Sequence, residues 1–223
     1  KKYDENAKLG GDDPYSVSKV AVENLRKEGF PFSAGSDSQQ RIELVGDVMY
    51  DLAVISRDIA YVKVSLDRWD LTEKRYLLCT VHRQENLNDR KRLGNILDAL
   101  NILSSENRVI LPLHPNTRAK ISDYDFDHKI KALTVMDPLP YLEMQRLLMG
   151  ASIILTDSGG MQKEAYFNRV PCMTLRDETE WEETIPEGWN QLVSAQTDVI
   201  LAAVRDIVIP KNQTLDLYGG GDA

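Results

Sequence analysis

The 223-residue sequence has few of the features that mark membrane, secreted or nucleic-acid-binding proteins. No stretch approaches the roughly 18 consecutive apolar residues that a membrane-spanning helix needs. The first ten residues lack the apolar segment of a signal peptide. With 27 basic and 35 acidic side chains the net charge is −8, and no basic stripe suggests nucleic acid as a partner. We therefore predict a cytoplasmic protein that binds neither membranes nor nucleic acid.

Cysteine is scarce, since only Cys79 and Cys172 are present, far apart and each within an apolar run. Two such residues are typical of buried thiols in a reducing compartment and do not suggest a disulfide framework. The sequence also lacks a His-x-x-x-His motif, a cysteine pair and a cluster of three carboxylates. We therefore predict neither a metal nor another cofactor.

From Arg75 onward the sequence alternates regularly between short apolar runs and helical patterns. The runs are continuous and rich in β-branched residues, as expected of strands that are buried on both faces of a sheet. They span Tyr76–Val81, Val109–Leu113, Leu133–Met136, Ser152–Thr156, Pro171–Leu175 and Gln191–Val193. Residues 93–100, 141–149 and 199–207 between them show helical spacing. The pattern predicts an α/β fold with a doubly wound parallel sheet.

The first 66 residues contain too few strands to form a sheet of their own. Ser18 is a candidate N-cap for a short helix that ends at Gly29, and Ile42–Val45 is predicted to be a single strand. Val48–Val64 is predicted to be a long amphipathic helix. Its apolar stripe consists of Met49, Leu52, Ile55, Ile59 and Val62. Because one strand and two helices cannot enclose a sheet, we expect a remnant of a second domain here.

Polar residues follow five successive strands at the points where those strands end. The first residues of interest after each strand are His82, His114, Asp137, Asp157 and Arg176. The carboxyl ends of parallel strands share one edge of the sheet, and ligands bind in the crevice outside that edge. We therefore predict a ligand site there, with His82 and His114 as functional residues. A histidine in this position often serves only as a helix cap, and His128, among charged residues, is expected to be a surface side chain.

The segment Asp157-Ser158-Gly159-Gly160 is the sharpest of these signals. Its two glycines let the backbone approach an anion, and the helix that begins there directs free N–H groups at the same point. Glu164, one turn into the helix, is placed to accept hydrogen bonds from the vicinal hydroxyls of a ribose. The alternatives are an ordinary turn capped by Ser158 and a solvent-exposed Glu164. The segment is neither G-x-G-x-x-G nor a Walker A sequence, so NAD and ATP are not indicated.

Six motifs, in order along residues 42–221, resemble those of the non-hydrolysing UDP-N-acetylglucosamine 2-epimerases. They are V-G-D-V-M-Y-D (45–51), T-V-H-R-Q-E-N (80–86), L-P-L-H-P-N-T-R (111–118), D-P-L-P-Y-L (137–142), L-T-D-S-G-G-M-Q-K-E-A (155–165) and V-P-C-M-T-L-R-D-E-T-E-W (170–181). The resemblance implies a GT-B-like fold, in which a UDP-sugar binds between two Rossmann-like domains. Residues 67–210 would be the UDP-binding Rossmann-like domain. Residues 1–66 would be the remnant of its N-terminal partner with linking helices, and residues 211–223 a C-terminal tail.

The resemblance also implies roles for individual residues. His82 is implied as the catalytic residue, and the residues implied to bind UDP or the sugar are His114, Met144, Ser158, Gly159, Gly160, Glu164 and Arg176. The diphosphate would lie over the glycine pair, the ribose on Glu164 and the uracil near Met144. Arg176 and His82 would line the phosphate and sugar end.

The family inverts the sugar at C2, interconverting UDP-N-acetylglucosamine and UDP-N-acetylmannosamine by eliminating UDP and adding it back. A protonated His82 and Arg176 would stabilise the charge on the departing diphosphate. The carboxylates that act at C2 come from the N-terminal domain in this family, and the resemblance implies that residues 41–65 correspond to the last strand and helix of that domain. We therefore expect an isomerase chain that binds UDP but epimerises little or nothing alone, and a homodimer in the full-length family.

Two other functions are compatible with this architecture: a UDP-sugar glycosyltransferase of GT-B fold and a non-catalytic UDP-binding module. Retaining transferases usually carry a second glutamate eight positions before the ribose carboxylate, where this sequence has Thr156. The opening segment also resembles the Tyr-x-x-x-Lys segment of short-chain dehydratase-epimerases, in which Tyr15 and Lys19 would be catalytic. That interpretation needs an upstream glycine-rich NAD-binding segment, which the sequence does not contain.

Overall fold

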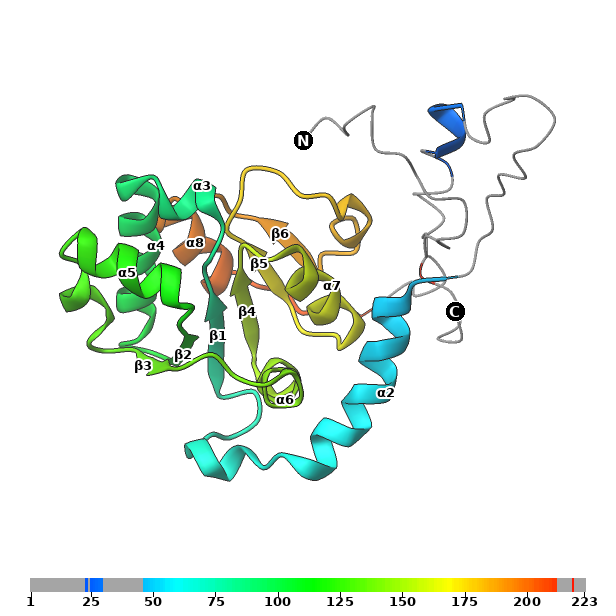
Figure 1. Ribbon diagram of the computed structural model, residues 1–223, viewed down its shortest axis with the longest axis horizontal. Coiled ribbons are helices and arrows are strands. Elements are labelled where there is room, and N and C mark those ends of the chain that lie inside the picture. The colour runs from blue at the N-terminus through cyan, green and yellow to red at the C-terminus, as the bar shows by residue number, and fades with distance from the viewer. Residues whose placement is uncertain (1–22, 24, 30–45, 212–217, 219–223) are drawn as a thin grey trace. The chain divides into compact units, whose positions relative to one another are not determined.

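The computed structural model describes residue 23 and residues 25–29, 46–211 and 218 (Figure 1). Contacts divide the chain into two compact units, residues 1–52 with 214–223 and residues 53–213. In the first unit a helical segment ends at Gly29, whose φ of 93° is the left-handed conformation that glycine adopts readily at a helix end. The predicted Ser18 cap, the strand over 42–45 and the Tyr15/Lys19 pair lie outside the described residues.

The second unit is built on a six-stranded parallel sheet with the strand order β3-β2-β1-β4-β5-β6 (Figure 1). The strands are β1 (Tyr76–Thr80), β2 (Arg108–Pro112), β3 (Thr134–Met136), β4 (Ile153–Thr156), β5 (Cys172–Thr174) and β6 (Asn190–Leu192). All six predicted strands are confirmed, and the ends differ from the prediction by one residue at most. The predicted doubly wound parallel α/β fold is therefore confirmed.

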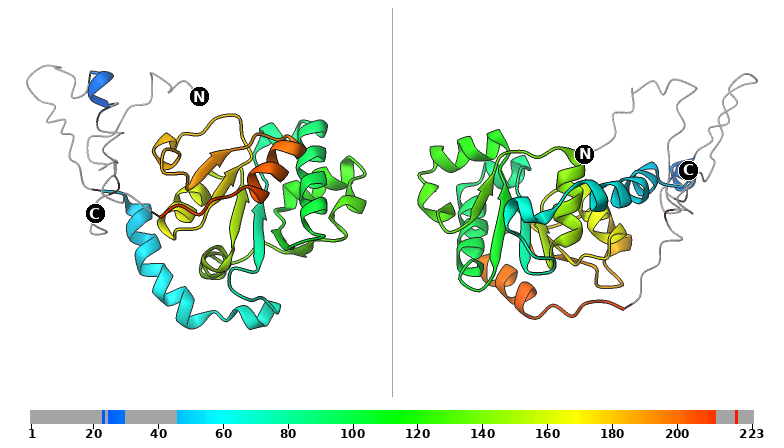
Figure 2. Two further views of the ribbon diagram at one scale, coloured as in Figure 1. Left: turned by 180° about the vertical axis from the view of Figure 1, so that it is seen from behind. Right: turned by 90° about the horizontal axis from the view of Figure 1, so that it is seen from below.

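Helices cover both faces of this sheet (Figures 1 and 2). The described helices are α2 (Val48–Lys63), α3 (Gln84–Leu87), α4 (Arg90–Leu103), α5 (Pro115–Asp123), α6 (Tyr141–Gly150), α7 (Gly159–Phe167) and α8 (Thr197–Arg205), with 3-10 turns η1 (Leu66–Trp69), η2 (Asp127–Ile130) and η3 (Glu182–Thr184). Among the described helices, none has both the length and the apolar character that crossing a membrane requires.

A hydrophobic core lies on each face of the sheet, and strand β1 contributes side chains to both. Leu77 and Cys79 pack in the core formed with α4 and α8, whereas Tyr76 and Leu78 pack in the core formed with η1, α6 and α7. Successive side chains of a strand point to opposite faces, so a strand covered on both sides is apolar throughout. The two cysteines, Cys79 and Cys172, are buried and unpaired, as predicted.

The strand order places a switch point between β1 and β4. From β1 the chain builds outward through β2 to β3, and from β4 it builds the other way through β5 to β6. The helices that follow β1 and β4 therefore diverge to opposite faces, and a crevice opens between the two strand ends. The hydroxyls of Thr80 and Thr156, the last residues of these strands, lie 2.7 Å apart. The residues that immediately follow them are held side by side.

Helix α2 is present as predicted, but its apolar stripe is not the face that is buried. Four members of that stripe are exposed: Leu52, Ile55, Ile59 and Val62. The buried residues are the small Ala53, Ser56 and Ala60. Small side chains allow close packing, and the Ser56 hydroxyl lies 3.4 Å from that of Tyr141 at the start of α6.

Candidate active site

The loop after β1 and the end of β4 are joined by the carboxylate of Asp157, which is completely buried. The backbone N–H groups of His82 and Arg83 donate to it at 3.0 Å each, and the Asn86 side-chain amide donates to it at 3.0 Å. The imidazole Nδ1 of His82 lies 3.3 Å from the nearer carboxylate oxygen. The hydrogen bonds from the three N–H groups to the carboxylate are charge-assisted and therefore stronger than neutral ones. The single side chain of Asp157 thus fixes the turn at the switch point.

Asn86 extends this network to a third strand end. Its amide nitrogen also donates to the carbonyl of Leu175, directly after β5, at 3.0 Å. Its amide oxygen accepts a hydrogen bond from Nε of Arg92 at 3.0 Å. Asn86 is completely buried, and both ends of its side chain are satisfied. The strand ends of β1, β4 and β5 are thus held in one hydrogen-bonded assembly.

Helix α7 begins at the glycine pair, as predicted. Ser158 is its N-cap, with the hydroxyl accepting from the backbone N–H of Met161 at 3.4 Å. The N–H of Ser158 itself donates to the Thr156 hydroxyl at 3.0 Å, which ties the cap back to β4. The capping role that was considered as the alternative for Ser158 is therefore present. An N-cap leaves other N–H groups of the first turn available to an anion, so the capping role and the anion seat are compatible.

The packing of Trp181, a residue to which the sequence analysis assigned no role, explains why position 159 is glycine. A Cβ atom on Gly159 would lie 2.9 Å from the indole nitrogen of Trp181, closer than side chains tolerate. That indole N–H is buried and has no hydrogen-bond partner among the described residues. The ammonium of Lys163 lies 4.2 Å from the centre of the Trp181 ring, a cation–π distance. Gly159 is thus required by the packing of Trp181 over the start of α7.

Glu164 is buried, which excludes the alternative of a solvent-exposed helix face. Burial raises the pKa of its carboxyl group, while the neighbouring side chains of Tyr141 and Gln145 act in the opposite direction. These two residues lie on α6, as does the half-buried Met144, which packs against the core beside them. A desolvated carboxylate beside an apolar side chain suits a ligand that brings its own hydroxyl donors.

Arg176, directly after the last residue of β5's apolar run, is almost completely buried at 5% exposure. Its Nε donates to Glu85 at 2.8 Å and its Nη1 donates to Glu180 at 2.7 Å. Both carboxylates are about half-exposed, so the guanidinium is held at the edge of the sheet by groups that reach solvent. A fixed cation at the carboxyl edge is suited to an anionic ligand.

His114 has a different environment from His82. It is exposed, and as the N-cap of α5 its Nδ1 accepts a hydrogen bond from the N–H of Asn116 at 3.2 Å. The capping role considered for histidines at strand ends is therefore present at this one. His128 is exposed, as predicted. Within the described part of the chain, no three His, Cys, Asp or Glu side chains are grouped as metal ligands would be.

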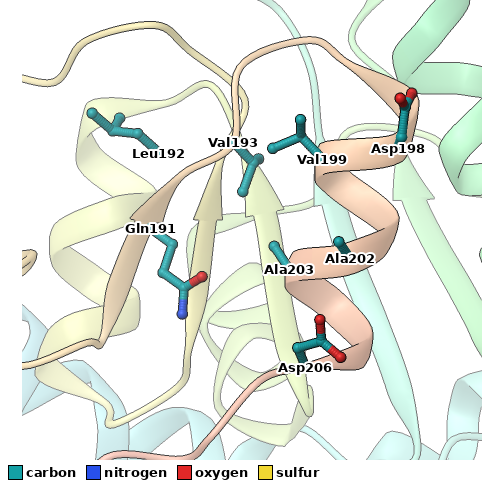
Figure 3. A pocket seen from close by; sticks show the side chains of 8 residues that line it. All are labelled: Gln191, Leu192, Val193, Asp198, Val199, Ala202, Ala203 and Asp206. Atoms are coloured by element: carbon teal, nitrogen blue, oxygen red, sulfur yellow. The ribbon is translucent and has the colours of Figure 1, made fainter.

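A hollow of about 500 Å³ lies between the edge strand β6 and helix α8 (Figure 3). Its lining consists of Gln191, Leu192, Val193, Asp198, Val199, Ala202, Ala203 and Asp206. This lining has two carboxylates and no basic side chain, so it is unsuited to a diphosphate. None of the predicted site residues lines it, and the strand ends at the switch point are the better candidate for an anionic ligand.

A family profile for UDP-N-acetylglucosamine 2-epimerase matches residues 15–223. The chain belongs to this family. A UDP-N-acetylglucosamine 2-epimerase homolog of Methanococcus maripaludis is 41% identical over 192 residues, which are 84% of this chain and 51% of the relative. A Pseudomonas aeruginosa relative, UDP-2,3-diacetamido-2,3-dideoxy-D-glucuronate 2-epimerase, is 41% identical over 94% of this chain and 56% of its own length.

The crystal structure of the Methanocaldococcus jannaschii UDP-GlcNAc 2-epimerase in complex with UDP-GlcNAc and UDP has the same fold. It superimposes with a TM-score of 0.75 at 31% identity, covering 93% of this chain and 58% of that one. The chain thus spans a little over half the length of the 2-epimerases that it matches. The parallel Rossmann-like sheet described above is part of this shared fold.

Proposed function

We propose that this chain supplies the UDP-binding part of a UDP-sugar 2-epimerase, an isomerase that interconverts UDP-N-acetylglucosamine and UDP-N-acetylmannosamine. One observation carries the proposal. Hydrogen bonds hold the ends of β1 and β4 together at the switch point, and these ends bring the His82–Asp157 pair close to the start of α7, the helix that carries the buried Glu164. These groups provide an anion seat, a hydroxyl acceptor and a titratable group at one edge of one sheet.

The proposed UDP position follows from the chemistry of each group. The diphosphate lies over Ser158, Gly159 and Gly160, where the helix N-terminus favours negative charge. The ribose hydroxyls donate to Glu164, and the uracil lies near Met144. Binding the ribose gives the buried carboxylate the hydrogen-bond donors that its desolvation calls for.

His82 and Arg176 act on the leaving group in this proposal. When the bond between C1 and the diphosphate breaks, negative charge develops on the diphosphate. A protonated His82, the guanidinium of Arg176 and the amides of α7 are arranged to stabilise that charge. His114, at the neighbouring strand end, is proposed as a further contact to the substrate.

The groups that remove and return the C2 proton are proposed to lie in the remainder of the 2-epimerase fold. Elimination of UDP and its re-addition require an acid and a base on opposite faces of the sugar, within hydrogen-bonding reach. The chain spans 51–58% of the relatives described above. UDP binding without appreciable epimerisation is therefore expected of this chain alone, and a homodimer is expected of the complete enzyme.

A second candidate substrate is a UDP-2,3-diacetamido-2,3-dideoxy-D-glucuronate. The Pseudomonas aeruginosa relative named for it is 41% identical over 94% of this chain, whereas a Methanocaldococcus jannaschii UDP-N-acetylglucosamine 2-epimerase is 30% identical over 93%. Both sugars share the UDP and the C2 acetamido centre, so the proposed roles of the UDP-binding residues are the same for both.

Calorimetry with UDP and exchange of the C2 proton test the proposal. The chain alone should bind UDP, and when it is joined to the N-terminal half of a 2-epimerase it should incorporate solvent deuterium at C2 of one of the two UDP-sugars. Comparing the two sugars in the same assay identifies the substrate. Absence of UDP binding by the folded chain would refute the UDP site. UDP binding without exchange in the joined protein would indicate a non-catalytic module.

A further inference from the structure

The turn after β1 is built around the buried carboxylate of Asp157, and the proposed function assigns this carboxylate no contact with the substrate. We propose that Asp157 is a positioning residue, which holds the neutral imidazole of His82 in the tautomer that carries its proton on Nδ1. In that tautomer the unprotonated Nε2 is the nitrogen that faces away from the carboxylate. The consequence for catalysis rests on the proposed function, whereas the tautomer itself does not.

The contacts of Asp157 leave little choice of tautomer. The other three groups around the carboxylate are N–H donors, from the backbone of His82 and Arg83 and from the side chain of Asn86. An ionised carboxylate only accepts hydrogen bonds. The His82 Nδ1 lies 3.3 Å from one of its oxygens. At that distance the negative charge of the carboxylate repels an Nδ1 lone pair and attracts an Nδ1–H.

The exposure of the two side chains sets the direction of the ring. Asp157 is 0% exposed, whereas the His82 side chain is 42% exposed. The ring therefore leads from a buried carboxylate toward the solvent at the carboxyl edge of the sheet. Because its two nitrogens lie on different sides of the ring, placing Nδ1 against Asp157 turns Nε2 away from it.

Protonation of His82 then takes place at a defined atom. The proton is added to Nε2, and the resulting Nε2–H is the donor that faces a departing diphosphate. Asp157 remains ionised and stabilises the imidazolium from behind. Without the carboxylate, the neutral ring would favour the Nε2–H form that is the more stable one for histidine in water, and both its orientation and its site of protonation would be lost.

The other two histidines of the sequence serve as internal references. The Nδ1 of His114 accepts a hydrogen bond from the Asn116 N–H, so the neutral ring must carry its proton on Nε2. The Nδ1 of His128 lies 2.9 Å from the carbonyl oxygen of Asp125, which only accepts, so this ring carries its proton on Nδ1. The structure therefore assigns opposite tautomers to His82 and His114, which follow the neighbouring strands β1 and β2.

Nitrogen-15 NMR of the imidazole side chains tests the inference in the ligand-free chain. At a pH at which the rings are neutral, the two-bond proton–nitrogen pattern should show Nδ1–H for His82 and Nε2–H for His114. A His82→Gln variant assigns the His82 signals. An Nε2–H pattern for His82 in the wild-type chain would overturn the inference, whatever any variant does.

The Asp157→Asn variant supplies the second arm. Provided that its circular dichroism shows the native fold, its His82 signals should move toward the Nε2–H pattern while those of His114 stay unchanged. A folded variant whose His82 tautomer is unaltered would show that Asp157 only builds the turn. Because both arms use the chain without UDP, a failure to bind UDP would refute the proposed function and leave this result standing.

Discussion

The loop after β1 and the loop after β2 both open with a histidine, yet the fold gives the two side chains different surroundings. His82 is backed by the buried carboxylate of Asp157, 75 positions away in the sequence. His114 is exposed and accepts a hydrogen bond from Asn116, two positions away. The difference arises because β1 is paired with β4, whose end supplies Asp157, whereas β2 lies one strand further from the switch point. A side chain at a strand end gains a buried partner when the neighbouring strand brings a second loop beside it, as β4 brings Asp157 to His82.

The largest expected effect is on the free energy of unfolding, and it distinguishes the carboxylate of Asp157, after β4, from that of Asp137, after β3. Replacing Asp157 by Ala leaves three N–H donors without their acceptor in a buried position. We expect this variant to lower the free energy of unfolding by about 3 to 5 kcal/mol, measured by urea denaturation. Asp137→Ala is the matched control, because this carboxylate is exposed and, within the described part of the chain, is held by nothing stronger than a 3.5 Å contact with Arg118. A loss below about 1 kcal/mol for Asp157→Ala would contradict the central role of that carboxylate.

A smaller effect is expected on ligand affinity. Glu164→Ala should weaken the binding of both UDP and uridine about 10- to 100-fold, because hydrogen bonds to a charged acceptor are worth about 1.5 to 3 kcal/mol. Calorimetry with the two ligands measures the effect, and the exposed Glu178 provides the control variant Glu178→Ala. If the affinity for UDP falls while that for uridine is unchanged, Glu164 does not bind the ribose.

The pKa of Glu164, which burial raises, predicts two opposite pH dependences. The carboxyl group accepts from both ribose hydroxyls only when ionised, so uridine affinity should fall as the pH is lowered through this raised pKa. The native state holds the proton to higher pH than the unfolded chain does. The free energy of unfolding should therefore fall as the pH rises through the same range. Glu164→Gln should remove both dependences in calorimetry and urea denaturation, and a pH-dependent uridine affinity that survives in this variant would assign it to another group.

The smallest effect is expected in the loop after β2. His114→Ala removes the N-cap acceptor of α5 and should lower the free energy of unfolding by about 0.5 to 1 kcal/mol, whereas His114→Asn, which can cap, should retain it. Urea denaturation of the two variants side by side gives the comparison. Equal losses in both would mean that the cap contributes nothing measurable to stability.

Much of this fold was predictable from the sequence because buried parallel strands are apolar throughout. All six strands, and the start of α7 at the glycine pair, were predicted in this way. The face that α2 buries was not, because the small Ala53, Ser56 and Ala60 are inconspicuous beside Ile55 and Val62. The apolar pattern of the sequence identifies the hydrophobic side chains of α2, whereas the face of α2 that is buried carries small side chains that allow close packing.

The position of the candidate site could be predicted from the sequence, but the contacts between its residues could not. Strand ends identified His82, Ser158 and Arg176, since each directly follows an apolar run or opens a glycine turn. The pairing of Asp157 with His82, and the packing of Trp181 over Gly159, depend on which strands are neighbours in the sheet. Asp157 was recognised as a residue at a strand end, but its position opposite the end of β1 follows only from the strand order of the folded sheet.

The claim that UDP binds at the switch point is tested most directly by titrating UDP into the chain and following the side-chain signals of its three histidines. If UDP binds at the switch point, the His82 imidazole signals should shift and saturate with UDP, those of His114 should shift less, and those of His128 should stay unchanged. Saturable binding that leaves His82 unshifted while His114 or His128 responds would place UDP elsewhere and contradict the account.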